Sequence, residues 1–242
     1  MRNYDLETTN RVTFIQEVLC NAKSSGIIFG NSGGKDAALV GILCKMACGN
    51  TLGVSMPCVV KRNYESDLGD AALLSKQYNI ENRTISLSAI RDIFTQTVST
   101  AANLTSDAIS NIAPRLRMTT LYAIAASENR LVAGTGNRSE RYTGYFTKWG
   151  DGGYDFNPIA DLTATEVWEF LRHLKAPDGI INKAPSAGLY EGQTDETAMG
   201  ITYESLDKFI LTGQVSEQDR PIIEKMHNIS EHKRKPPEVY GG

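Results

Sequence analysis

The sequence contains no long hydrophobic run, and this absence excludes the simplest kind of membrane protein. No apolar stretch approaches the roughly 20 residues that a membrane-spanning helix needs. The first residues also lack the apolar centre of a secretory signal peptide. We therefore expect a cytoplasmic protein that has no membrane partner.

Basic residues are not in excess either. The chain has 25 lysines and arginines against 28 aspartates and glutamates, which gives a net charge of −3. Surfaces built to bind a nucleic-acid backbone are usually basic, so we expect no nucleic-acid partner and favour a small substrate. The four cysteines (Cys20, Cys44, Cys48 and Cys58) follow no paired metal-ligand spacing, and we expect them to be reduced packing thiols.

Two common nucleotide-binding motifs are missing, and so is any sign of a second domain. The sequence has neither the Walker-A spacing nor a GxGxxG motif. It also shows no internal repeat and no linker between two large domains, so we predict one domain over residues 1–242.

What the sequence does contain is an alternation of strand and helix patterns, which is typical of a parallel sheet with helices on its faces. We expect strands over residues 26–29, 51–56, 83–87 and 131–134. We expect helices over residues 36–48, 66–78 and 163–174, a helical stretch over 88–128 with a break at Pro114, and short helices over 203–211 and 217–228. Residues 135–155 and 176–194 show no regular period and are expected to be functional loops.

The first candidate site is Ser32-Gly33-Gly34-Lys35-Asp36, which follows the first expected strand and opens the next helix. Backbone amides at such a helix N-terminus bind anions, and the glycines let a phosphate approach closely. Asp36 beside a bound polyphosphate implies a cation between them, and Mg²⁺ is the expected one. The alternative is a plain Gly-Gly turn with Asp36 as the helix N-cap.

The second candidate site is the segment from Gly134 to Glu140, which also leaves the end of an expected strand. Loops at the carboxyl ends of adjacent parallel strands share one crevice, so this segment can face the first one. Glu140 could then be a second magnesium ligand, and Thr135 could donate a hydrogen bond to the nucleotide.

These two segments, taken with several others, resemble ammonia-dependent NAD synthetase. The most specific match is the stretch TGYFTKWGDGG at residues 143–153, whereas SGGxD alone fits any member of the wider ATP-pyrophosphatase group. The other matching segments are residues 115–118, 183–189, 194–197 and 232–234. The resemblance implies a doubly wound, mostly parallel α/β sheet with helices on both faces, of the adenine nucleotide alpha hydrolase type.

The resemblance also implies an activity. ATP would adenylate the nicotinate carboxylate of deamido-NAD, and ammonia would then displace AMP to give NAD. The chain would take free ammonia or ammonia from a partner, because family members that use glutamine carry an additional amidase domain. Family members are homodimers, and we expect the interface in the helical stretch over residues 88–128.

The resemblance assigns roles to individual residues. Asp36 and Glu140 would hold Mg²⁺ and act in catalysis together with Lys35. The residues expected at ATP are Gly30, Asn31, Ser32, Gly33, Gly34, Lys35, Asp36, Ala37, Thr135 and Ser186. Those expected at deamido-NAD are Arg115, Lys148, Asp155, His232 and Lys233.

Three positions depart from the family pattern. Ala37 stands where the phosphate loop of the family ends in serine, and Ala164 stands where a lysine would reach the ATP phosphates. The pair Gly136-Asn137 replaces the more usual Asp-His. We hypothesise that Lys35 substitutes for the missing lysine charge.

Two other functions remain open from the sequence. Another ATP pyrophosphatase would adenylate a different acceptor, such as a nucleobase or a tRNA base. A nucleotide-binding module that has lost catalysis is the third hypothesis, because Ala37 and Ala164 each remove a polar group from the expected site.

Overall fold

The central element is a parallel four-stranded sheet with the strand order β3-β2-β1-β4. The structure is a computed structural model that describes residues 2–58, 64–183 and 195–241. The strands are β1 (Gly26–Gly30), β2 (Thr51–Ser55), β3 (Glu81–Thr84) and β4 (Arg130–Ala133). The chain moves outward from β1 in one direction to β3 and then returns to the other side of β1 for β4. The strand order therefore reverses between β1 and β4, which is where open α/β sheets bind their ligands.

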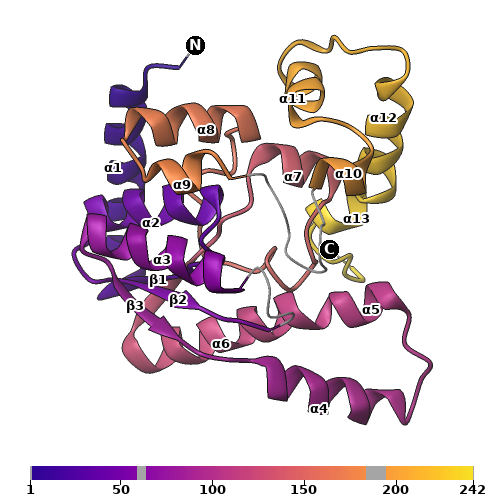
Figure 1. The fold of residues 1–242 in the computed structure, drawn as a ribbon, viewed down its shortest axis with the longest axis horizontal. Helices are drawn as coiled ribbons and strands as arrows, with labels where there is room; N and C mark the ends of the chain where they lie inside the picture. Colours follow the sequence, from indigo (N-terminus) through magenta and orange to yellow (C-terminus); the bar gives the residue numbers. More distant parts are fainter. Residues whose placement is uncertain (1, 59–63, 184–194, 242) are drawn as a thin grey trace.

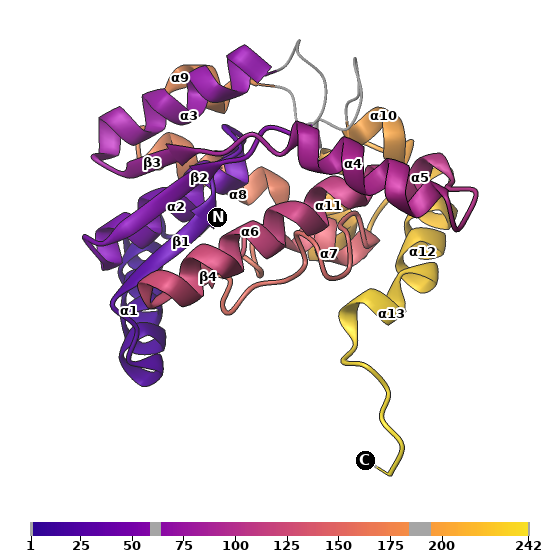
Figure 2. The ribbon, with the colours of Figure 1, turned by 90° about the horizontal axis from the view of Figure 1, so that it is seen from below.

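Helices cover both faces of the sheet (Figure 1). In Figure 1, helices α1, α2 and α8 lie above the strands, and α6 and α4 lie below them. Figure 2 shows the molecule from the side that α6 covers. The helices of this part of the molecule are α1 (Tyr4–Ala22), α2 (Lys35–Ala47), α3 (Tyr64–Tyr78), α4 (Ser88–Ser99), α5 (Ser106–Ser110), α6 (Ile112–Glu128), α8 (Ala164–His173) and α9 (Asp178–Ile181). Of these, α4 and α5 pack against α6.

Side chains that alternate along β1 fill two separate hydrophobic cores. Ile27 and Phe29 point into the core beneath α1, α2 and α8, whereas Ile28 points into the core against α6. Successive residues of a strand face opposite sides, so a strand buried on both faces is continuously hydrophobic. The two cores together hold β1 rigidly, and the loop that leaves its carboxyl end therefore has a fixed base.

A third hydrophobic cluster lies beside the sheet rather than on it. It is formed around Leu206, Tyr203 and Ile223, and Ala164 joins it from the first turn of α8. Figure 1 shows the helices of this part grouped on the side of the molecule away from α1. They are α7 (Arg138–Thr143), α10 (Asp195–Met199), α11 (Tyr203–Thr212), α12 (Asp219–Ile229) and α13 (Glu231–Arg234).

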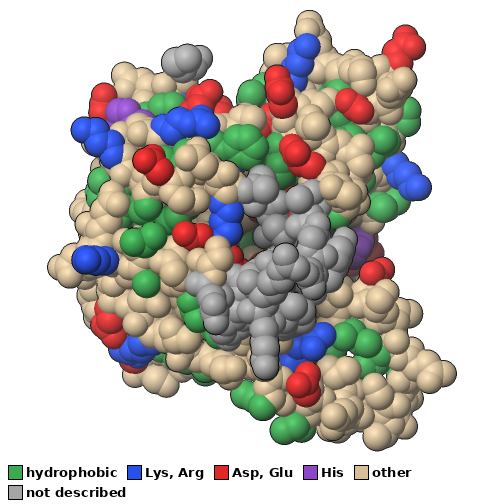
Figure 3. All heavy atoms as spheres, viewed as in Figure 1, with side chains coloured by type: hydrophobic (Ala, Val, Ile, Leu, Met, Phe, Trp, Pro, Cys, Tyr) green, Lys and Arg blue, Asp and Glu red, His purple; other side chains and the backbone are tan. Residues whose placement is uncertain are grey.

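Helix α4 keeps a hydrophobic face on the surface. None of its residues is buried, and Ile90, Ile93 and Phe94 are 52%, 64% and 47% exposed. These three residues lie three and four positions apart, so they share one face of the helix. Figure 3 shows hydrophobic side chains on the surface where α4 lies in Figure 1.

The predicted fold class is confirmed, with differences at particular elements. The structure adds α1 before the first predicted strand, and β3 lies at Glu81–Thr84 rather than at residues 83–87. The break expected at Pro114 falls at Asn111, because proline is tolerated in the first turn of α6. The loop expected over residues 135–155 contains the short helix α7, and the stretch after residue 176 contains α9.

Among the residues described here, no helix is both long and apolar enough to cross a membrane.

Candidate active site

The phosphate loop, residues 31–34, leaves the carboxyl end of β1 and enters α2. Gly33 has a φ of +76°, and a Cβ at this position would lie 2.3 Å from the backbone oxygen of Asp67 in α3. Gly34 is the N-cap of α2 and offers no side chain to the first N–H groups of the helix. Those N–H groups have no partner inside the helix, so they are available to an anion.

The residues expected at ATP take different positions in this loop. Gly30 ends β1, and the exposed Ser32 accepts a hydrogen bond at Oγ from the Gly34 N–H at 3.2 Å. Asn31 is buried, and its amide donates to Asn82 of β3 at 3.0 Å. Ala37 is buried in the first turn of α2. Asn31 therefore ties the loop to the scaffold through its side chain, while the surface of the loop is made by backbone and by Ser32.

A second loop leaves β4, the strand next to β1. Gly134 donates its N–H to the Phe156 oxygen at 2.8 Å, and a Cβ on Gly134 would lie 2.4 Å from the Tyr154 ring. Half-buried Thr135 follows, and then Gly136, whose oxygen accepts a hydrogen bond from the Asn157 amide at 2.8 Å. The loop ends in α7, whose first turn carries Glu140.

Asn137 joins the two loops. Its Nδ2 donates to Oδ1 of Asp36 at 3.0 Å, and its Oδ1 accepts from the N–H of Glu140 at 3.0 Å. The Asn137 N–H in turn donates to Oε2 of Glu140 at 3.0 Å, which completes a capping box on α7. The hydrogen bonds of Asn137 thus bring Asp36 and Glu140, which the sequence predicts as a pair, to one side chain. Asp36 is not the N-cap of α2, because Gly34 takes that place.

Both carboxylates have raised pKa values, and burial is the largest cause for each. Burial raises the pKa of Asp36 from 3.8 to about 6, although the hydrogen bond from Asn137 opposes this rise. Burial, followed by the charge of Asp36, raises the pKa of Glu140 well above its ordinary value. The carboxylate of Asp195, which is buried and accepts a hydrogen bond from Tyr203 at 3.3 Å, adds negative charge nearby. A cation placed between Asp36 and Glu140 would remove this repulsion.

The donor set suits a magnesium ion. Within the described ranges, no three His, Cys, Asp or Glu side chains form a metal-binding group, so the protein itself offers two carboxylates here. Mg²⁺ is commonly held by one or two carboxylates, with water and substrate phosphates filling the other positions. Asp36 and Glu140 beside the phosphate loop therefore fit Mg²⁺ that arrives with ATP.

Lys35 points toward α8 instead of across the phosphate loop. Its Nζ donates to the backbone oxygen of Lys183 and lies 4.9 Å from the ring centroid of Trp168. Burial lowers the pKa of Lys35, and the charge of Asp36 opposes this effect. Trp168 stands one helical turn after Ala164, so the Lys35 ammonium lies near the helix on which the family places its lysine.

The basic residues expected at deamido-NAD form one group. Lys148 donates from Nζ to the His232 oxygen at 2.7 Å, and an Arg115 nitrogen lies 3.4 Å from the Lys148 oxygen. Lys233 donates to the oxygens of Gly144 and Phe146, at 2.7 Å each. The tail helix α13 is thereby fixed to the loop that contains TGYFTKWGDGG.

Of the other positions considered, Asp155 and Ala164 make their contacts elsewhere. Asp155 accepts hydrogen bonds from Tyr122 at 3.0 Å and from the Val132 N–H at 2.7 Å, so its contacts are with α6 and β4. Ser186 lies outside the described residues. Ala164 is only 3% exposed and packs in the third hydrophobic cluster.

The residues predicted for this site did not include Asn137, Asp195 or Tyr203. The spacing of Asn137 and Glu140 is that of a capping box, so their contact could have been predicted. The structure shows the same box at Thr163 and Glu166. The contact of Asn137 with Asp36 had no such signal, because the two residues are 101 positions apart.

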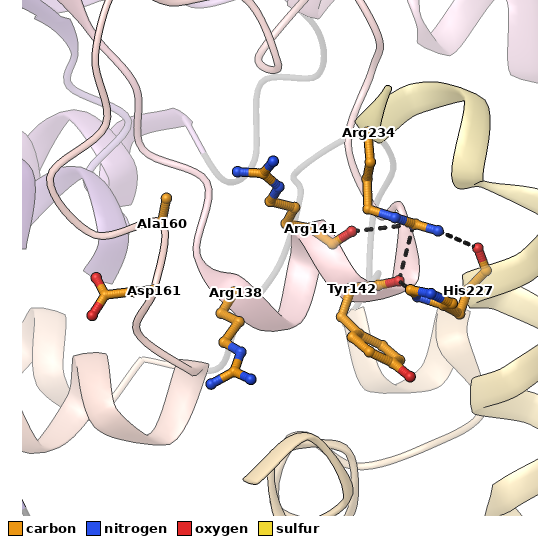
Figure 4. Close-up of a pocket in the computed structure, with 7 residues that line it drawn as sticks. All are labelled: Arg138, Arg141, Tyr142, Ala160, Asp161, His227 and Arg234. Carbon is orange, nitrogen blue, oxygen red and sulfur yellow. Dashed lines mark hydrogen bonds between the residues drawn. The ribbon is translucent and has the colours of Figure 1, made fainter. Parts of the chain in front are cut away.

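A separate cavity of about 300 Å³ lies along α7, outside the phosphate loop (Figure 4). In Figure 4 the guanidinium of Arg234 points toward α7, where it donates to the backbone oxygen of Tyr142 at 3.1 Å. The cavity is lined by Arg138, Arg141, Tyr142, Ala160, Asp161, His227 and Arg234. None of these residues is among those predicted to bind substrate.

Comparisons with known proteins agree on one family. The sequence model of the family described as "NAD synthase" matches residues 7–237. The NH(3)-dependent NAD(+) synthetase of Carboxydothermus hydrogenoformans is 45% identical, over 98% of each chain. The solved NMN synthetase of Francisella tularensis is 37% identical over the full length of both chains, with a TM-score of 0.93. The solved NH3-dependent NAD synthetase of Campylobacter jejuni is 30% identical over 99% of each chain, with a TM-score of 0.81.

Asp36→Asn should stabilise the protein at neutral pH in the absence of magnesium and nucleotide. Because the folded-state pKa of about 6 lies above the ordinary 3.8, the ionised carboxylate reduces stability above pH 6. Asparagine avoids this cost, which amounts to about 3 kcal/mol for such a difference in pKa. The difference in the free energy of unfolding between variant and wild type should shrink as the pH falls from 6 and vanish near 3.8. Urea unfolding at several pH values measures it.

Asp161→Asn is the matched control, with the opposite sign. Burial alone would raise the pKa of Asp161, but the hydrogen bonds and charge of Arg11 lower it. This variant should therefore be less stable than the wild type at pH 7, with a deficit that fades as the pH falls through the lowered pKa. If Asp36→Asn also destabilised the protein at pH 7, the raised pKa of Asp36 in the folded protein would be refuted.

Proposed function

We propose that this chain, which belongs to the NAD synthase family, is an ATP-dependent ligase that amidates the nicotinate carboxyl group of deamido-NAD with ammonia. We base this on the hydrogen bonds by which Asn137 joins Asp36, just after the phosphate loop, to Glu140, just after the loop that follows β4. This junction places a phosphate-binding helix end and two carboxylates at the reversal point of the sheet. A cytoplasmic location fits these substrates and stays a prediction.

The reaction has two steps. In the first, a carboxylate oxygen of the nicotinate attacks the α-phosphorus of ATP, the bond to the bridging oxygen breaks, and pyrophosphate leaves. In the second, ammonia attacks the carboxyl carbon, the bond to the AMP oxygen breaks, and the nitrogen loses a proton. The first step is needed because a free carboxylate has no good leaving group. Catalysis would consist mainly of positioning and charge neutralisation.

The phosphate loop would bind the pyrophosphate portion of ATP. The free N–H groups at the start of α2 supply donors, Gly33 lets the phosphates approach, and Ser32 adds a hydroxyl. Asp36 and Glu140 would hold the magnesium ion, which when bound neutralises charge on the phosphates. Thr135, at the end of β4, would contact the nucleotide from the opposite side of the crevice.

The group around Lys148 would bind the acceptor nucleotide. Arg115, Lys148, His232 and Lys233 gather positive and hydrogen-bonding groups beside the TGYFTKWGDGG loop, and a dinucleotide carries phosphates that such groups recognise. Asp155, which accepts a hydrogen bond from the N–H of Val132 in β4, would contact the acceptor from that side.

A second candidate acceptor is the mononucleotide of nicotinate, with the same chemistry at the carboxyl group. It is favoured by one observation, the match to the solved NMN synthetase over the full length of both chains. The first candidate is favoured by relatives with NAD synthetase names at 45% and 40% identity.

Incubation with ATP, Mg²⁺ and ammonia should convert deamido-NAD to NAD, with one AMP and one pyrophosphate for each NAD. Glu140→Gln should reduce the rate by about 100-fold, because it removes a charge that the reaction uses. Chromatography of the products measures the stoichiometry and the rate. A parallel incubation uses nicotinate mononucleotide in place of deamido-NAD. Formation of NMN in preference to NAD would select the second candidate, and formation of neither product would defeat the proposed function.

Lys35→Gln should reduce kcat by about 100-fold if the ammonium compensates for the lysine that Ala164 replaces. The physical reason is that departing pyrophosphate carries negative charge that an uncharged amide stabilises poorly. The matched control is Lys45→Gln at the other end of α2, where Nζ only donates to the Gly49 oxygen at 2.7 Å. Steady-state kinetics and thermal unfolding should be measured together: a lower melting temperature with unchanged kcat would show that Lys35 only packs α2 against Lys183 and Trp168.

The chain would act as a homodimer that associates through α4 and its neighbours. The hydrophobic face of Ile90, Ile93 and Phe94 supports this, since no described element of the same chain covers it. Exposed apolar patches on such a scale are typical of interaction sites.

Ile93→Glu should convert the dimer to a monomer, because it places a charge in the centre of the apolar contact. Light scattering after size-exclusion chromatography measures the mass. Leu211→Glu is the matched control, since Leu211 is also exposed but lies on α11. An unchanged mass for Ile93→Glu would place the interface elsewhere.

A further inference from the structure

The side chain of Asn137 uses both of its polar atoms to hold the two acidic loops together. The N–H of Glu140 requires an oxygen at Oδ1, so the orientation of the amide is fixed and Nδ2 must face Asp36. The side chain is 2% exposed, which keeps water from exchanging with these bonds. Asparagine here is therefore more than an ordinary helix cap.

This arrangement occupies one oxygen of each carboxylate. Oδ1 of Asp36 accepts from Asn137 Nδ2, and Oε2 of Glu140 accepts from the Asn137 N–H. The second oxygens, Oδ2 of Asp36 and Oε1 of Glu140, have no hydrogen bond to another residue in the described part of the chain. Each carboxylate is thus held by one oxygen and leaves the other available.

We propose that Asn137 is the positioning residue of the magnesium site: it sets the separation and orientation of Asp36 and Glu140 so that their free oxygens bind one cation. The inference rests on the proposed function, because it deepens the account of the same site. Groups that orient metal ligands through hydrogen bonds usually change metal affinity about 10- to 100-fold when they are lost.

A neutral group with one donor and one acceptor is required at this position. Serine or threonine can accept from the Glu140 N–H and cap α7, but a short hydroxyl does not span the distance to Asp36. Asn137→Ser therefore removes the bridge and keeps the cap.

The test measures binding of Mn²⁺ to the full chain in the presence of ATP and without acceptor, so that no turnover occurs. Electron paramagnetic resonance gives the concentration of free Mn²⁺, and thermal unfolding checks that each variant is folded. Asn137→Ser should weaken Mn²⁺ binding at least tenfold. Asn3→Ala is the matched control, because Asn3 caps α1 through the Leu6 N–H at 3.2 Å, on a helix that carries no site residue.

Wild-type Mn²⁺ affinity in Asn137→Ser would overturn the proposal, as would an equal loss in Asn3→Ala. Asn137→Thr gives a second capping variant if the serine variant does not fold, and the same two outcomes apply to it. Failure of the proposed function is distinguishable, since wild-type protein that binds Mn²⁺ with ATP but forms neither NAD nor NMN would leave the role of Asn137 intact.

Discussion

The site depends on bringing two like charges together at the reversal point of the sheet. Asp36 lies in the first turn of α2 and Glu140 in the first turn of α7. Burial and the charge of Asp36 both raise the pKa of Glu140. Asn137 makes this arrangement possible by bonding to one oxygen of each carboxylate. Such an arrangement stores unfavourable electrostatic energy until a cation arrives, which is a common cost of binding sites.

The fold supplies the rigidity that this pair needs. Each face of β1 is covered by its own hydrophobic core, so the end of the strand has little freedom to move. Gly33 then turns the chain beneath the backbone of α3 with no room for a side chain. On the other side, the Gly134 backbone is tied to Phe156 beneath the Tyr154 ring. The phosphate loop and the Glu140 loop are therefore fixed before any ligand binds.

Several elements of the fold were predictable from local sequence patterns. The glycine pair after a hydrophobic strand indicated the turn that opens α2, and the alternation of patterns indicated the parallel sheet. The helix expected over residues 163–174 is α8, whose N-cap is Thr163 and whose first residue is Ala164. Each of these signals depends on neighbours in the sequence, so no knowledge of the rest of the fold was required.

Contacts between distant segments were not predictable in this way. The bond from Asn137 to Asp36, the approach of Asp195 to both carboxylates and the turn of Lys35 toward Trp168 all depend on how the helices pack. Helix α7 was missed because its six residues are polar and too short to show a period. The resemblance to a family proposed residues for the site, but the contacts of Asn137 came only from the structure.

The central claim is that Asp36 and Glu140 act as a pair on the phosphates of one nucleotide. A crystal structure of the chain with ATP and Mg²⁺ tests this most directly. The account predicts a single ion in contact with Oδ2 of Asp36, Oε1 of Glu140 and phosphate oxygens, with the phosphates on the N–H groups at the start of α2. An ion that contacts only one of these carboxylates, or phosphates bound away from residues 32–36, would contradict it.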